Sequence, residues 1–161
     1  MLESTTEMIG HFAGIELEMD DWEGAPYLVL IRPEDTGQVL MLPSVAELWK
    51  LLAAVAASVA ISPEKAPFAT DGVTGVLLVA EGHKLIDTSG TEYDTIKSMG
   101  LELSDVPNST EIKMIIAVDS TGNTYAELER GSTEFTAATM PFEGQVLDGV
   151  KAVYTALERV R

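Results

Sequence analysis

The chain has 161 residues, of which 46% are hydrophobic and none is cysteine, and it carries 26 acidic against 10 basic side chains. The apolar fraction is too high for a disordered chain, and the length suits a single domain over residues 1–161. The lack of cysteine excludes disulfides, zinc–thiolate sites and cysteine nucleophiles. The net charge of −16 disfavours contact with nucleic-acid phosphates or anionic membranes.

The N-terminal region predicts a short helix followed by an acidic segment. Ser4 and Glu7 have the spacing of a capping box for a helix over residues 4–13, which Gly14 would end. After it, carboxylates crowd around Trp22. They are Glu16, Glu18, Asp20, Asp21 and Glu23. This concentration is uneven along the chain, because residues 1–40 hold nine acids and one base.

Next come a hairpin and an amphipathic helix. The apolar runs 27–32 and 38–42 flank a turn at 33–37 that is rich in turn-forming residues. The helix is expected over residues 45–60, with Ser44 and Glu47 as a second capping box and an apolar stripe that includes Trp49 in the core. The same helix is rich in alanine, which would let another element approach closely.

The rest of the chain alternates between strands and helices. The segment 73–80 is apolar on both alternating faces, which is typical of a central strand covered on both sides. The later elements are a helix over 91–99, strands over 111–118 and 124–130, a loop over 131–143 and a closing helix over 145–160. In the strand 111–118, one face is expected to carry Ile112, Met114, Ile116 and Val118, and the other Glu111 and Lys113.

The predicted order is therefore α-ββ-α-β-α-ββ-α, an α+β fold. It calls for a mainly antiparallel sheet of about five strands with helices packed on it. Because some strands are apolar on both faces and two helices are strong, the second face needs a cover. The short helices, the long loop or a second copy of the chain could supply it, which leaves a homodimer open.

Candidate catalytic groups are few. His83 follows the central strand close to Glu81, and the two could form a base with its orienting partner, but no nucleophile or third group is identifiable. Acidic residues are so abundant that a pair of catalytic carboxylates cannot be picked out. We predict no catalytic residue and no cofactor, and keep an enzyme with a carboxylate/His83 site as an alternative.

The acidic segment around Trp22 is the preferred candidate for a binding surface. It lacks the ligand spacing of a calcium loop, so we predict no metal site there. An aromatic side chain among carboxylates is typical of an interface hot spot, and the alternative is that Trp22 covers one end of the sheet. The candidate protein-binding residues are Glu18, Asp20, Asp21, Trp22 and Glu23.

Several short motifs resemble those of a group of small acidic actinobacterial or actinophage proteins of uncharacterised function. These motifs are Asp21-Trp22-Glu23 before Pro26, the strand from Val73 to Glu81, and Glu111-Ile112-Lys113-Met114 running into Ala117-Val118 and the Gly122 turn. With the closing helix they cover most of the chain in order. The resemblance implies a cytoplasmic location and no particular activity.

These observations favour a cytoplasmic, non-catalytic protein-interaction or adaptor domain whose protein partner is basic or inserts an apolar side chain. The longest apolar stretch, from Leu51 to Ile61, is too short to span a bilayer, and no basic stripe for nucleic acid exists. One alternative is a dimer that resembles secretion chaperones, which are small acidic proteins with a helix-flanked antiparallel sheet. Another is a DNA mimic, which would need carboxylates spaced like phosphates.

Overall fold

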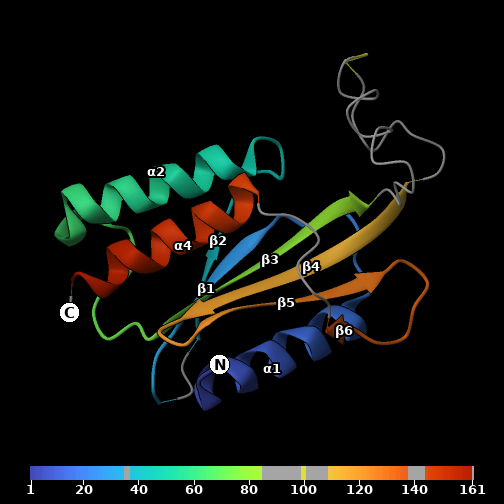
Figure 1. Cartoon of the computed structure of the whole chain (residues 1–161), viewed down its shortest axis with the longest axis horizontal. Helices are drawn as coiled ribbons and strands as arrows, with labels where there is room; N and C mark the ends of the chain where they lie inside the picture. The colour runs from blue at the N-terminus through green and yellow to red at the C-terminus, as the bar shows by residue number, and fades with distance from the viewer. Residues whose placement is uncertain (35–36, 85–98, 101–108, 138–143, 161) are drawn as a thin grey trace.

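The computed structural model describes residues 1–34, 37–84, 99–100, 109–137 and 144–160. These residues form three α-helices and a six-stranded antiparallel sheet, which confirms the α+β prediction (Figure 1). The strand order is β2-β1-β3-β4-β5-β6. Apart from Met99, the helix predicted over 91–99 lies outside the described residues.

The elements follow the predicted order, with one additional strand. They are α1 (Glu3–Met19), β1 (Tyr27–Ile31), β2 (Gly37–Met41), α2 (Leu48–Ile61), the 3-10 turn η1 (Pro63–Lys65), β3 (Gly75–Lys84), β4 (Thr110–Asp119), β5 (Gly122–Glu129), β6 (Thr136–Ala137) and α4 (Gln145–Glu158). The additional strand, β6, has two residues and lies in the segment predicted as a loop. Such a short run carries no periodicity that a sequence pattern could detect.

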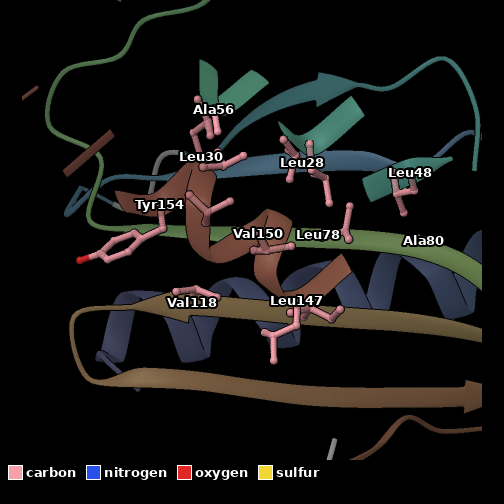
Figure 2. Close-up of a cluster of buried hydrophobic side chains, with 14 of the residues drawn as sticks. Leu28, Leu30, Leu48, Ala56, Leu78, Ala80, Val118, Leu147, Val150 and Tyr154 are labelled. Atoms are coloured by element: carbon pink, nitrogen blue, oxygen red, sulfur yellow. The ribbon is translucent and has the colours of Figure 1, made fainter. Parts of the chain in front are cut away.

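The middle of the sheet is buried on both faces. On one face, Leu28 and Leu30 of β1 and Leu78 of β3 pack against α2 and α4, which contributes Val150 (Figure 2). On the other face, α1 covers alternate residues of the same strands, and Figure 1 shows it opposite α2 and α4. The prediction that β3 is covered on both sides is thus confirmed, because α1 supplies the second cover.

Helix α1 is longer than predicted. It runs through Gly14 to Met19 and begins after Leu2, with no side chain capping its N-terminus, so the Ser4/Glu7 capping box is wrong. Its buried residues recur at steps of three and four, and they are Thr5, Met8, Phe12 and Glu16. A glycine costs a helix about 1 kcal/mol, which is less than this continuous burial provides.

The start of α2 also differs from the prediction. The helix begins at Leu48, and Ser44 instead accepts a hydrogen bond on its Oγ from the N–H of Ala46 at 3.0 Å. Glu47 takes a left-handed backbone conformation, with φ of 52°. Trp49 is 38% exposed rather than in the core. The buried face of the helix is instead formed by Leu48, Leu52, Ala56 and Val59.

Asp119 joins the β4–β5 turn to the start of α1. Its Oδ2 accepts the N–H of Leu2 at 2.8 Å, and its Oδ1 accepts the N–H and the hydroxyl of Thr121 at 2.8 and 2.6 Å. Burial alone would raise the pKa of Asp119, but these hydrogen bonds outweigh it and lower the pKa below its ordinary value of 3.8. The ionised carboxylate therefore holds the N-terminus of α1 against the sheet.

We predict that Asp119→Asn lowers the free energy of unfolding by about 2 kcal/mol at pH 7, since hydrogen bonds to a charged acceptor are weakened. A group with a depressed folded pKa stabilises the fold above its unfolded pKa, and this stabilisation is lost as the pH falls through its folded pKa. Urea unfolding of both proteins across the acid range measures this. A difference that stays constant down to the lowest pH would contradict the charged role of Asp119.

Candidate functional site

A pocket of about 350 Å³ opens on the α1 face of the sheet. It lies between the second half of α1, the hairpin β1–β2 and the middle of β3 and β4. Most of its lining is apolar, from residues that include Phe12, Ile15, Met19, Tyr27, Val39 and Met41. Its charged lining consists of Glu16, Asp21, Glu81 and Lys113. An apolar hollow with a few converging polar groups is the usual form of a binding site.

A buried ion pair forms one wall of the pocket. Lys113 of β4 is 1% exposed, and its Nζ lies 3.0 Å from Oε2 of Glu16 on α1. The hydroxyl of Tyr27 donates to the other carboxylate oxygen of Glu16 at 2.6 Å. Burial, reinforced by this hydrogen bond and the nearby charge, raises the pKa of Tyr27 above its ordinary value of 10.0. The predicted alternation of β4 is confirmed, because Ile112, Met114, Ile116 and Val118 lie in the α2/α4 core and Lys113 points to the other face, which α1 covers.

Glu81 is the second carboxylate of the pocket. It lies directly opposite Lys113 in the β3–β4 register. Burial raises the pKa of Glu81, and the charges of Asp21 and Glu16 add to the rise, while a backbone hydrogen bond from Gly24 and the charge of Lys113 oppose it. Three carboxylates therefore share the pocket with one ammonium group, and Lys113 is already paired with Glu16.

Trp22 lies over the same lysine. Its ring centroid is 4.9 Å from Nζ of Lys113 and 5.7 Å from Cζ of Arg130, distances at which cations attract an aromatic face. Its indole N–H donates to Oδ1 of Asp20 at 3.2 Å. Trp22 is half-buried, and its position over β4 agrees with the interpretation that it covers part of the sheet.

The histidine of the sequence prediction lies away from this pocket. His83 belongs to β3 itself rather than to a loop after it, and its Nε2 is 3.8 Å from Oε1 of Glu111, directly across in β4. Arg130 pairs with the other oxygen of Glu111. His83 therefore contacts Glu111 rather than Glu81, and Glu81 but not His83 lines the pocket.

The predicted binding residues gather near the pocket but in different roles. Asp20, Asp21, Trp22 and Glu23 line a shallow hollow with Arg130, and Asp21 also lines the main pocket. Asp20 ends α1 in a left-handed conformation, and Asp21 accepts the N–H of Glu23 at 2.9 Å. Glu18 is exposed on the last turn of α1.

Sequence reasoning missed the inner residues of the site. The sequence placed Glu16 only among the carboxylates around Trp22, and it indicated no role for Tyr27 or Lys113. One signal could have pointed to Lys113, since Ile115 and Ala117 share its side of β4 and are apolar. That pattern predicts a covered face on which a lysine needs a partner.

Within the described ranges, no three histidine, aspartate or glutamate side chains gather closely enough to hold a metal ion. In the same part of the chain, no helix is long and apolar enough to cross a membrane. Protein-family models, curated proteins and solved structures contain no match to this chain.

We predict that Lys113→Met lowers the free energy of unfolding by about 3 kcal/mol, because Glu16 would keep a buried charge without its cation. Adding Glu16→Gln removes that charge and leaves an acceptor for Tyr27. The double variant should therefore be more stable than Lys113→Met alone. Urea unfolding of the two single variants and the double variant measures the coupling. Losses that simply add would contradict a paired, buried role.

Proposed function

We propose that this chain is an acidic protein-interaction domain that binds a basic segment of a partner protein on its α1 face. One observation carries the proposal: a mostly apolar pocket whose charged groups are three carboxylates and one lysine, with further exposed carboxylates beside it. Glu18, Asp20 and Glu23 are exposed around the same end of α1. A cytoplasmic setting fits a chain without cysteine.

The charges around the pocket favour a cationic partner. Lys113 is neutralised by Glu16 at 3.0 Å, which leaves the carboxylates of Asp21 and Glu81 as the surplus in the pocket. A lysine or arginine side chain that enters would relieve the repulsion between these carboxylates. The apolar lining would meanwhile contact its aliphatic stem. Electrostatic attraction of this kind gives specificity and a fast encounter more than raw affinity.

Trp22 supports this surface rather than inserting into a partner. Its ring already lies over Lys113 and Arg130, and its N–H is bonded to Asp20. These contacts hold the loop of Asp21 and Glu23 in one conformation. We therefore place the main contact in the neighbouring pocket and give the loop the role of an acidic rim.

An enzyme is the second candidate, and one observation favours it. Glu81 has a raised pKa in a largely apolar pocket beside another carboxylate, and such a group can serve as a general acid. The binding proposal is preferred because Lys113, the basic group opposite Glu81, is buried in an ion pair with Glu16. No described side chain in the pocket is placed as a nucleophile with its own base.

The proposal is tested with four neutral substitutions that keep the shape of each side chain. We expect Glu18→Gln/Asp20→Asn/Asp21→Asn/Glu23→Gln to bind basic peptides about tenfold more weakly at low salt, since each rim charge contributes a few tenths of a kcal/mol. A peptide array in which net charge and apolar content vary independently, read by fluorescence anisotropy at low and high salt, measures this.

The matched control removes the same number of charges from exposed positions elsewhere in the chain. It is Glu64→Gln/Asp71→Asn/Asp148→Asn/Glu158→Gln. It should retain most of the binding of the unmodified protein. Equal losses in both variants would mean that net charge alone attracts the peptides, and this result would contradict a local binding surface.

A further inference from the structure

Among the described residues, strand β2 is an edge of the sheet with no further strand beside it. It pairs with β1 over Gly37–Met41 in a continuous register, and it is the terminal strand in the sheet order. Its sequence, Gly-Gln-Val-Leu-Met, contains no charge and no proline, and the register shows no bulge. Proteins usually protect an exposed edge with one of these features, because its free N–H and C=O groups can pair with another chain.

The direction of the backbone groups of β2 follows from one hydrogen bond. The N–H of Leu42 donates to the carbonyl of Pro26 at 2.9 Å, so Leu42 directs its backbone groups toward β1. Residues alternate in an antiparallel strand, and Leu40 and Gln38 therefore also face β1. Gly37, Val39 and Met41 direct their N–H and C=O groups toward the free edge.

The same residues present their side chains to the pocket. Val39 and Met41 lie opposite Val29 and Tyr27 in the register, on the α1 face, and both line the pocket. They are 46% and 58% exposed, and the neighbouring Met19 of α1 is exposed as well. The open edge and the open side of the pocket are thus formed by the same strand.

We propose that an extended segment of a basic partner adds to β2 as a further strand and places lysine or arginine side chains in the pocket. This inference rests on the proposed function and specifies how the partner binds. A residue directly opposite Val39 or Met41 would point to the α1 face. Its aliphatic stem would lie along Val39, Met41 and Met19, and its charged end would point toward the acidic side of the pocket.

The alternate residues of the bound segment are apolar. They would point to the opposite face of the sheet, where the half-buried Leu40 packs at the border of the α2/α4 core. The segment therefore alternates basic and apolar residues over about four to six positions, the length of β2. Such a pattern is recognised by main-chain hydrogen bonds together with alternate side-chain pockets.

Charge disfavours a second copy of the chain as the occupant. Two β2 strands paired about Val39 would bring two sets of the carboxylates Asp21 and Glu81 to one interface, and each copy carries a net charge of −16. A self-paired edge would also offer valine and methionine, with no cation for either pocket. A basic extended segment can both pair with the backbone of β2 and neutralise the carboxylates of the pocket.

The test uses a synthetic peptide of alternating lysine and valine with blocked ends. Its control has the same composition with all lysines preceding all valines. We expect the alternating peptide to bind about tenfold more tightly than the control, because only alternation separates the two faces. Hydrogen exchange read by NMR should show slowed exchange at the amides of Val39 and Met41 on binding, while Gln38 and Leu40 are protected before and after.

Val39→Pro tests the edge directly. It removes an N–H that faces away from β1, a position where an edge strand accepts proline. We expect binding of the alternating peptide to fall about tenfold or more, from the lost hydrogen bond and the steric block at the edge. Val39→Thr is the matched control, since it keeps the N–H and the β-branched shape, and its affinity should stay within about threefold.

Several results would overturn the inference. If the peptide binds with unchanged exchange at Val39 and Met41, or equally to Val39→Pro, the edge is not the binding site, while the acidic-face proposal survives. Should sedimentation show a dimer with these amides protected before peptide is added, a second copy occupies the edge. If neither this peptide nor the basic peptides of the array bind at low salt, the proposed function fails together with the inference.

Discussion

The rest of the structure depends on one constraint: the central strands of the sheet are apolar on both faces and must be covered twice. On one face, α2 and α4 cover the sheet together. They pack so closely that a Cβ on Gly149 of α4 would lie 2.8 Å from Cβ of Leu52 on α2. On the other face, α1 is the one helix that the described residues provide. A single helix cannot cover the width of a six-stranded sheet, so part of that face is closed by other means.

The buried ion pair closes part of what α1 leaves open. Removing a lysine from water is costly, and the cost is offset here by the carboxylate of Glu16 and the ring of Trp22. Glu16 lies near the end of α1, and Trp22 lies in the segment that follows it. The contacts that stabilise Lys113 therefore also fix the position of the helix end and of that segment. The pocket lies directly beside this cluster, where neither α1 nor Trp22 covers the sheet. Two of its acidic groups, Glu16 and Glu81, are therefore held on rigid elements, and Asp21 lies in the loop after α1.

The strands could be predicted from the sequence because burial on one face leaves a local alternation and burial on both faces leaves a continuous apolar run. The length of α1 could not, since Gly14 is a local signal for a helix end and the burial of Phe12 and Glu16 against the sheet overrides it. Both capping boxes failed for the same reason: their spacing is present, but no side chain caps either helix N-terminus. Lys113 shows the limit most clearly, because its partner Glu16 is 97 positions away in the chain.

The candidate binding site was predicted in part. The carboxylates beside Trp22 are contiguous in the sequence, so their concentration could be detected, and four of the five residues named do lie around one hollow. The main pocket joins α1 to β2, β3 and β4, and no local pattern marks such a meeting of distant elements. The role of Trp22 was also hidden, because the cations over its ring, Lys113 and Arg130, come from the far half of the chain.

The net negative charge of the chain bears on which other chains can pair with the edge strand β2. A strand such as Gly37–Met41, without charge or proline, invites pairing with any exposed strand, including its own copy. A surplus of carboxylates repels other copies of this acidic chain without altering the edge itself, and it attracts a basic chain. The protection that other proteins build into the edge strand is here supplied by the surrounding charge. If a basic segment binds the edge as we propose, charge of this kind would exclude unsuitable partners while leaving the backbone of β2 available.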